Sequence, residues 1–331
     1  MWRVAKMKDE VLAFLKQEEE YCSGEEISQK LGVTRAAVWK AIKKLQEEGY
    51  EIVSSTKKGY KLVNRPNIIT SGEIKEHLNT KRLGQVVEYR DEVDSTNNLA
   101  KELARKGASE GTLVVADKQT SGKGRLGRNW ESPAGTGIWM SLILRPNILP
   151  QYASQLTIVA GLGVCEAIKK STGLEAKIKW PNDVVVNGKK VCGILTEMSA
   201  EMDRINYVVV GIGINANMEA FPEELPYATS LKIEGQKECI RKEIIQCFLE
   251  IFEEDYNQYR VDMSLEAMRA RYEENCITLH KRVKLLRREG ESIAEAIGIT
   301  NSGALIIKYE NGMEEEIVSG EVSVRGLYGY V

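Results

Sequence analysis

The feature that most constrains the fold is an alternation of strand-like and helix-like runs between about residues 84 and 273. Short runs rich in β-branched residues predict strands at 86–89, 113–116, 138–144, 177–180, 184–186, 191–196 and 207–212. Longer runs favour helices at 95–107, 153–173 and 237–259. Because Asn187–Gly188 is a strong signal for a two-residue hairpin, we predict a mixed α/β sheet that is not all parallel.

A different pattern occupies residues 274–331, where short strand-like runs alternate with tight turns such as Asn311–Gly312. This pattern predicts a small SH3-like β-barrel. Residues 1–64 form a third block, of helical character. We therefore expect a multidomain α+β protein with domains at 1–64, 65–273 and 274–331, which a chain of 331 residues is long enough to form.

The N-terminal block has the pattern of a winged helix-turn-helix. Ser23 and Glu26 form a capping box that predicts the start of one helix; Gly32 ends that helix and Thr34 caps the next. Two helices joined by a short turn containing glycine are typical of the helix-turn-helix motif. Residues 51–63 alternate around a Ser/Lys/Gly centre, which predicts a β-hairpin, the wing.

Positive charge is concentrated in this block, although the net charge of the chain is −2: residues 30–61 hold eight basic and three acidic side chains. Such asymmetry is expected of a surface that faces nucleic-acid phosphates. We predict that the second helix enters the DNA major groove, where its small residues allow close approach. The residues assigned to DNA are Thr34, Arg35, Ala36, Ala37, Trp39, Lys40 and Lys43. The alternative is a helical adaptor that binds protein.

Composition narrows the classes of protein to which this chain can belong. Hydrophobic residues make up 43% of the chain and charged residues 28%, as in ordinary soluble proteins. No apolar run approaches the roughly 18 residues of a membrane span, and none predicts a secretory signal. The six cysteines are scattered without a C-x-x-C pair, which argues against a zinc site or a disulfide framework. We expect buried, reduced thiols, a cytoplasmic location, no membrane partner, and His77 on a surface helix.

Residues 122–130, GKGRLGRNW, combine three glycines with three cations and a tryptophan. The run matches G-x-G-x-x-G, but Pro133 and further glycines follow it instead of a helix, so it is not a dinucleotide fingerprint. Successive glycine N–H groups can form an anion-binding nest, cationic side chains add charge, and Trp130 offers a face to a purine base. We therefore predict a nucleotide-binding loop; the alternative is a solvated basic turn.

Three further motifs place polar groups at the ends of strands or helices. In KWPNDVVVNGKKVCGIL (179–195), Asn182 and Asp183 lie on a turn and Lys190 begins the returning strand. DSTNNLA (94–100) puts hydroxyl groups at a helix N-terminus, which suits an anion. GIGIN (211–215) ends a strand in Asn215. The structural alternatives are a surface hairpin, a plain N-cap and a strand-terminal turn.

Taken together, the chain resembles the biotin–protein ligases, because DSTN, KQTSGKGRLGRNWESP, KWPNDVVVNGKKVCGIL and GIGIN occur in that family's order with comparable spacings. Its helix-turn-helix makes it similar to the bifunctional form, which is both biotin–[acetyl-CoA-carboxylase] ligase and biotin operon repressor. The resemblance spans essentially the whole chain and implies an ATP-dependent ligase.

The resemblance also implies ligand-binding residues. For biotin they are Ser95, Thr96, Asn97, Gln119, Gly122, Lys123, Gly124, Arg125, Lys190, Gly193 and Gly211. For ATP and the adenylate they are Arg128, Trp130, Asn182, Asp183, Asn215 and Arg325, with Mg²⁺ bound to ATP near Asp183. Arg125 and Lys190 would be catalytic, and Lys123 stands where the family often has arginine.

In this family biotin is activated as biotinyl-5′-AMP, and a lysine of a biotin carboxyl carrier protein then accepts the biotinyl group. The resemblance further implies that biotinyl-5′-AMP acts as corepressor, that the liganded protein is a homodimer, and that the dimer binds operator DNA. The alternatives are a repressor with little ligase turnover, a ligase whose helix-turn-helix does not bind DNA, and a relative that transfers lipoyl or octanoyl groups.

Overall fold

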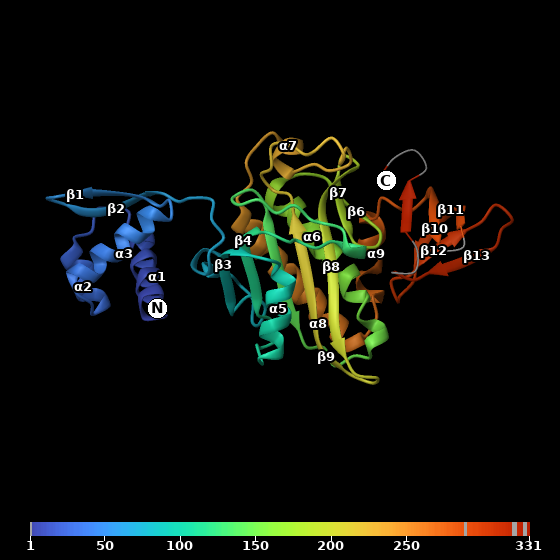
Figure 1. Ribbon diagram of the computed structural model, residues 1–331, viewed down its shortest axis with the longest axis horizontal. Coiled ribbons are helices and arrows are strands. Elements are labelled where there is room, and N and C mark those ends of the chain that lie inside the picture. The colour runs from blue at the N-terminus through green and yellow to red at the C-terminus, as the bar shows by residue number, and fades with distance from the viewer. Residues whose placement is uncertain (1, 288–289, 320–322, 327–329) are drawn as a thin grey trace. The chain divides into compact units, whose positions relative to one another are not determined.

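The computed structural model describes residues 2–287, 290–319, 323–326 and 330–331 (Figure 1). The other residues of the expected terminal domains, which are 1, 288–289, 320–322 and 327–329, lie outside the described residues. The chain forms two units, Met1–Asn67 and Ile68–Val331. The boundary expected near residue 274 falls within the second unit and stays a prediction.

The first unit is a helix-turn-helix followed by a hairpin. Its elements are α1 (Trp2–Gln17), α2 (Gly24–Leu31), α3 (Arg35–Glu47) and the antiparallel strands β1 (Glu51–Ser55) and β2 (Gly59–Asn64). Ser23 Oγ accepts the Glu26 N–H at 3.0 Å, and Thr34 Oγ1 accepts the Ala37 N–H at 3.2 Å. Gly32 ends α2 with a φ of 64°, a left-handed conformation that glycine adopts without strain. The predicted caps and wing are therefore present.

The second unit is built on a seven-stranded sheet. Its strand order is β3-β4-β5-β9-β8-β7-β6; β3 and β4 are parallel, and the other neighbours are antiparallel. The strands are β3 (Val87–Val93), β4 (Leu113–Gln119), β5 (Ile138–Leu144), β6 (Ala176–Lys179), β7 (Asp183–Val186), β8 (Lys189–Ala200) and β9 (Ile205–Ile214). Asn187 and Gly188 have φ of 50° and 76°, as a type I′ hairpin between β7 and β8 requires. The predicted mixed sheet is confirmed.

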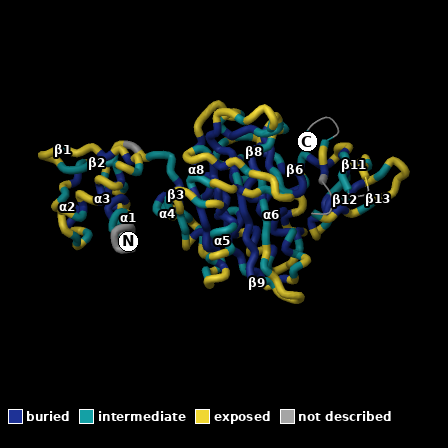
Figure 2. The backbone as a smooth tube through the Cα atoms, in the orientation of Figure 1, coloured by how far each residue is buried: buried dark blue, intermediate teal, exposed yellow. Residues whose placement is uncertain are grey.

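Helices cover both faces of this sheet because its strands alternate apolar side chains between the two faces. Val208 and Val210 join the large core beneath α6 (Gln155–Thr172) and α8 (Arg241–Asp262). Tyr207 and Val209 belong to a smaller cluster with α5 (Thr96–Arg105). Figure 2 shows the buried residues concentrated in the sheet and α6. The central strands β5 and β9 are thus buried on both sides, which explains their continuous apolar composition.

The C-terminal strands form a separate five-stranded sheet of order β13-β12-β11-β10-β14. They are β10 (Lys281–Arg287), β11 (Gly290–Ile299), β12 (Leu305–Lys308), β13 (Glu314–Ile317) and β14 (Ser323–Gly326). Within the described ranges, β13 and β14 do not pair, so this sheet is not closed into the expected barrel. The chain also forms α4 (Ser71–Lys75), α7 (Leu231–Gly235), α9 (Glu266–Asn275) and 3₁₀ turns at Arg125–Gly127 and Pro150–Tyr152.

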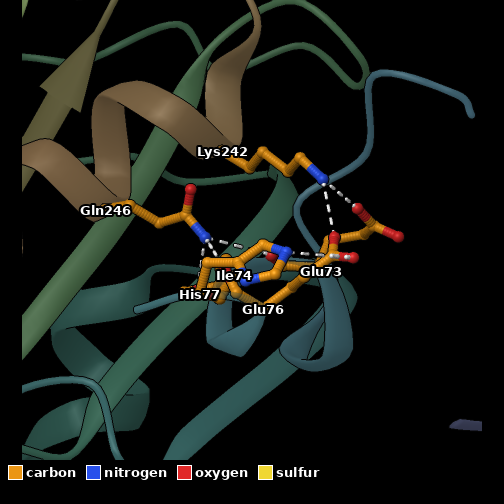
Figure 3. Close-up of polar contacts among 6 residues, drawn as sticks. All are labelled: Glu73, Ile74, Glu76, His77, Lys242 and Gln246. Atoms are coloured by element: carbon orange, nitrogen blue, oxygen red, sulfur yellow. Dashed lines mark hydrogen bonds and ion pairs between the residues drawn. The ribbon is translucent and has the colours of Figure 1, made fainter. Parts of the chain in front are cut away.

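Helix α4 is fastened to α8 by polar contacts, as Figure 3 shows. Lys242 Nζ lies 2.5 Å from Glu73 and 3.0 Å from Glu76, and the Gln246 amide donates to the Ile74 carbonyl at 3.0 Å. Gln246 thereby satisfies a carbonyl that the end of a helix leaves without a partner. His77 is exposed, as expected, but its φ of 61° places it beyond the end of α4 and not on a surface helix.

We predict that Lys242→Met destabilises the second unit. The Glu73 side chain is only 1% exposed, so loss of the ammonium partner leaves a buried carboxylate less compensated, at a cost of about 2 kcal/mol. Chemical denaturation measures the difference in free energy of unfolding between Lys242→Met and the wild type. Lys232→Met is the matched control, because Lys232 pairs with an exposed carboxylate of Glu219 and its loss is expected to leave the midpoint unchanged. Equal midpoints for Lys242→Met and the wild type would contradict the prediction.

Candidate functional site

The candidate site lies on the α5 face of the seven-stranded sheet, beyond the start of that helix. A helix of ten residues spans about 15 Å, so α5 covers only part of the face. Beyond Val209, the same face of β9 continues as Gly211 and Gly213, and Gly193 lies opposite Gly213 on β8. Glycines leave this part of the sheet without side chains, and loops close over it.

A cavity of about 890 Å³ occupies this position. Every residue assigned above to biotin or ATP lines it, with the exception of Gly122. These residues come from α5, β4, β7, β8, β9, β14 and the glycine-rich loop, so the fold gathers motifs that are far apart in sequence. The volume is within the usual range of about 300–1,000 Å³ for small-molecule sites.

The glycine-rich loop is a narrow hairpin. Gly124 N–H donates to the Arg128 carbonyl at 2.7 Å, and Trp130 N–H donates to the Gly122 carbonyl at 2.9 Å. The predicted nest is therefore not formed as expected: the Gly124 N–H bonds within the loop, and Gly127 is the loop glycine with a positive φ, at 72°. Gly122 has a packing role, because a Cβ there would lie 2.3 Å from the Trp130 carbonyl oxygen.

Side chains of the loop reach across the cavity to the opposite turn. Arg125 donates to Asn182 Oδ1 at 2.6 Å, and burial lowers the pKa of its guanidinium. The Trp130 indole lies over Gly213, where a Cβ would come within 2.6 Å of its Nε1. Lys190 Nζ is 5.2 Å from the centre of the Trp130 ring, a cation–π distance. The loop is thus docked on the turn before β7 through Arg125, and on β8 and β9 through Trp130.

Asp183 is the acidic centre of the cavity. Lys190 Nζ lies 2.5 Å from Asp183 Oδ1, and the Tyr330 hydroxyl donates to Asp183 Oδ2. Lys179 Nζ stands 3.9 Å from the centre of the Tyr330 ring. Burial, followed by the charges of nearby cations, lowers the pKa of Lys179 to about 8 despite the opposing effect of Asp183. One carboxylate therefore lies among several cations.

Sequence reasoning missed Lys179 and Tyr330 as site residues. Lys179 is the first residue of the K-W-P-N-D motif and ends β6, so the signal for it was present in the sequence. Tyr330 carries no local motif, and 147 residues separate it from Asp183. Its proximity to the motif is a property of the tertiary structure alone.

The other end of the cavity is uncharged and hydrogen-bonded. Thr96 N–H and its hydroxyl both donate to Gln119 Oε1, at 2.8 and 3.0 Å. Ser141 donates to Asn97 Oδ1 at 2.6 Å, while Ser95, at the N-cap, makes no side-chain capping bond. A Cβ on Gly211 would lie 2.0 Å from Asn97 Oδ1. Gly211 is therefore needed to admit the Asn97 amide, and not only, as expected, to let a ligand ring approach the backbone.

The remaining predicted residues frame the site. Asn215 is buried and donates to the Thr229 carbonyl at 3.1 Å, which secures the segment before α7 that closes one side of the cavity. Lys123 Nζ is 3.2 Å from Asn98 Oδ1. Arg128 and Arg325 are exposed at the cavity mouth, and Arg325 contributes to the lowered pKa of Lys179.

The donor set fits a metal ion that arrives with a ligand. Among the residues the structure describes, no group of three or more His, Cys, Asp or Glu side chains could hold a metal ion. Asp183 supplies one carboxylate, which is already paired with Lys190. Mg²⁺ is commonly held by one or two carboxylates, substrate phosphates and waters, so Asp183 is compatible with nucleotide-bound Mg²⁺.

The residues assigned to DNA share the outer face of α3. Val38, Ala41, Ile42 and Leu45 are buried against the rest of the first unit. Ala37 is half-buried, whereas Thr34, Arg35, Ala36, Lys40 and Lys43 are exposed. Trp39 is 51% exposed although it is a large aromatic residue. This face is available for a partner outside the unit.

Two further expectations, about the cysteines and about membrane-spanning helices, can be compared with the structure. All six cysteines are free and buried, as predicted. Over the described ranges, the helices are too short or too polar to cross a lipid bilayer.

Comparisons with known proteins give the class first. Residues 89–215 match the Biotin/lipoate A/B protein ligase family, 8–61 match the HTH domain, and 278–325 match the Biotin protein ligase C terminal domain. The fold and site are thus those of a protein ligase joined to a helix-turn-helix domain.

Whole-chain relatives give the particular family. The Bifunctional ligase/repressor BirA of Bacillus spizizenii is 41% identical over 320 residues, which cover 96% of this chain and 98% of the relative. The Escherichia coli (strain K12) protein of the same name is 28% identical, covering 92% and 94%. The biotin protein ligase from Aquifex aeolicus in complex with biotin and ATP aligns with a TM-score of 0.64 and 36% identity, over 73% of this chain and 99% of that one. The chain belongs to the bifunctional biotin ligase/repressor family.

We predict that Lys179→Met stabilises the unliganded protein at neutral pH. The pKa of Lys179 is about 8 in the folded protein and 10.5 ordinarily, so the buried charge opposes folding fully below pH 8. The opposition disappears as pH rises from 8 to above 10.5, because the unfolded chain binds more protons in this window. Replacement by methionine should raise the free energy of unfolding by at most about 3 kcal/mol at pH 7, and by much less above pH 10.

Chemical denaturation at pH 7 and above pH 10 checks this difference. The control is Lys118→Met, which removes an exposed lysine paired with Glu92 and should leave stability unchanged at both values. A Lys179→Met protein less stable than the wild type at pH 7 would show that the ring of Tyr330 and Asp183 compensate the ammonium fully.

Proposed function

We propose that this chain uses ATP to activate biotin as biotinyl-5′-AMP, transfers the biotinyl group to a lysine of a biotin carboxyl carrier protein, and represses transcription with biotinyl-5′-AMP bound. The observation that carries the proposal is the cavity itself. It joins an uncharged, hydrogen-bonding end around Thr96 and Gln119 to a cationic end around Arg125, Lys179 and Lys190. The whole-chain relatives named above support the same function.

The two ends of the cavity suit the two parts of the reaction. The neutral ureido ring of biotin requires hydroxyl and amide partners, which Ser95, Thr96, Asn97 and Gln119 supply. The biotin carboxylate and the α-phosphate are both anions, so they meet only where cations compensate their repulsion. Arg125 and Lys190 are the proposed catalytic residues at that end.

In the first step, a biotin carboxylate oxygen attacks the α-phosphorus of ATP. A P–O bond forms, the bond between the α- and β-phosphates breaks, and diphosphate leaves with its electron pair. Negative charge grows on the α-phosphate oxygens in the transition state, where the guanidinium of Arg125 and the ammonium of Lys190 would stabilise it; loss of one such donor typically costs a factor of about 10² to 10³ in rate. Mg²⁺ bound with ATP would supply further charge neutralisation, and Asp183 would be its carboxylate ligand from the protein.

In the second step, the neutral amine of the carrier's lysine attacks the acyl carbon of biotinyl-5′-AMP. An amide C–N bond forms, the acyl C–O bond breaks, AMP leaves, and the amine proton goes to solvent. The docked hairpin of residues 122–130 would shield the mixed anhydride from water until the carrier binds. Trp130, already placed against Gly193 and Gly213, is proposed to line the adenylate side.

Mass spectrometry of a purified carrier domain tests this function. With ATP, Mg²⁺ and biotin, the wild-type chain should add one biotinyl group to the carrier. Arg125→Ala should slow formation of biotinyl-5′-AMP about 10²-fold, whereas Arg105→Ala, an exposed position on α5, should not. A carrier that stays unlabelled while biotinyl-5′-AMP is bound would support the repressor with little turnover. In a parallel reaction with lipoate or octanoate in place of biotin, a carrier that gains that acyl group would support the third alternative.

We propose that the liganded protein is a cytoplasmic homodimer and that its edge strand β3 serves two partners. In the described part of the sheet, β3 pairs on one side with β4, and residues 90–92 of β3 are exposed. An edge of this kind can accept a strand from a second copy or from the carrier. A shared edge would make repression and biotin transfer exclude each other.

We predict that Lys40→Ala weakens operator binding through loss of a phosphate contact. The wild-type affinity should fall steeply with salt, and the variant should lower the slope of log affinity against log salt by about 1. Titration of a labelled palindromic operator, with biotinyl-5′-AMP present, measures both. Lys170→Ala, which changes an exposed lysine of the second unit, is the control. A wild-type chain without salt-dependent binding would favour the ligase whose helix-turn-helix does not bind DNA.

A further inference from the structure

We propose that Tyr330 is a positioning residue for the adenylation step, acting through Asp183 on Lys190. This inference rests on the proposed function, because it concerns the same cavity. It assigns a role to the penultimate residue of the sequence, which lies outside every motif considered above.

The contacts of Asp183 give the first argument. Its two carboxylate oxygens have different partners: Oδ1 lies 2.5 Å from Lys190 Nζ, and Oδ2 accepts the Tyr330 hydroxyl. The Tyr330 hydroxyl is the donor in its bond, so it occupies one oxygen of the carboxylate while Lys190 pairs with the other. The same carboxylate thus connects Tyr330 to Lys190.

Two neighbouring side chains hold the ring of Tyr330 in position. The ring stacks on Tyr227, with centroids 4.8 Å apart and an interplanar angle of 6°. Lys179 Nζ lies 3.9 Å from the centroid of the same ring. A stacked ring that also contacts a buried ammonium is held in one orientation, which aims the hydroxyl at Asp183.

Tyr330 forms part of the wall and does not fill the cavity. With its side chain in place, the cavity still measures about 890 Å³, which is room for a nucleotide and a small acid. Substrate can therefore bind while Tyr330 remains bonded to Asp183.

The electrostatic consequence concerns Lys190. A hydrogen bond from a neutral donor takes up part of the charge of a carboxylate, and a carboxylate so satisfied holds a neighbouring ammonium less tightly. With Tyr330 bonded to Oδ2, Oδ1 holds Lys190 less tightly, so Lys190 can turn more readily to the biotin carboxylate and the α-phosphate. Without the hydroxyl, Asp183 would retain Lys190, and the transition state would lose part of its stabilisation.

The test uses Tyr330→Phe, which keeps the ring and removes the donor. Rapid-quench measurement of biotinyl-5′-AMP formation should show kcat reduced about tenfold, the effect of one hydrogen bond to a charged group, with KM for ATP changed less than about twofold. Tyr256→Phe is the matched control, because it removes a buried tyrosine–carboxylate bond, to Glu110 at 2.7 Å, outside the cavity lining. It should leave kcat unchanged.

Action through Asp183 is tested in the Asp183→Asn background. If Tyr330 works through that carboxylate, adding Tyr330→Phe to Asp183→Asn should not lower kcat further. An unchanged kcat in the single variant, a further loss in the double variant, or tighter ATP binding with unchanged kcat would each overturn the inference. Failure of the proposed function is a separate result, because then the wild-type chain itself would form no biotinyl-5′-AMP.

Discussion

The arrangement of the site depends on one carboxylate among many cations. Asp183 pairs directly with Lys190, and its charge also acts on Lys179 and Arg125. Burial raises the cost of charge on Lys179 and Arg125, and repulsion from neighbouring cations adds to it. The lowered pKa values of Lys179 and Arg125 record that cost. The cavity lining carries more cationic than acidic side chains, and the phosphates and carboxylate of the proposed substrates would restore the balance.

Glycine placement explains why the cavity exists on one face of the sheet only. On the α6 face, Ile194, Ile212 and Ile214 continue the large core without a break. On the α5 face, the same strands carry Gly193, Gly211 and Gly213, and each added Cβ would meet a side chain: Trp130, Lys190 or Asn97. Because side chains alternate between the two faces of a strand, the same stretches of β8 and β9 form a closed core on one face and an open site on the other.

Much of the fold was predictable because its signals are local. The caps at Ser23 and Thr34, the Asn187–Gly188 turn and the apolar strands each follow from a few adjacent residues. Helix α9 was not predicted, because within Glu266–Asn275 the buried hydrophobic side chains are just Met268 and Tyr272, too few for an apolar stripe. The closed barrel was expected from turns and strand lengths, which do not determine whether the first and last strands of a sheet meet.

The site residues that could be predicted from the sequence are those that belong to a recognisable motif. The motifs located the residues that line the cavity, but they could not show how the loop uses its N–H groups, why Gly211 must be glycine, or that Tyr330 approaches Asp183. The loop N–H groups bond within the loop itself, and in the other two cases the deciding contact joins residues distant in sequence, Asn97 with Gly211 and Tyr330 with Asp183. A motif therefore identifies which residues meet, whereas the partner of each atom depends on packing.

The start of the glycine-rich loop gives the two proposed activities a common structural element. Thr120 N–H donates to the Val93 carbonyl at 2.9 Å, and Ser121 N–H donates to the Asp94 carbonyl at 2.8 Å, so the loop begins bonded to the end of β3. Lys123 also contacts Asn98, which in turn donates to Asp94. A ligand that fixes the loop through Arg125 therefore also restrains the end of the edge strand proposed to meet the second copy. Occupancy of the cavity and availability of the edge are then linked by hydrogen bonds between residues 93–98 and residues 120–123, and no rearrangement of the sheet is required.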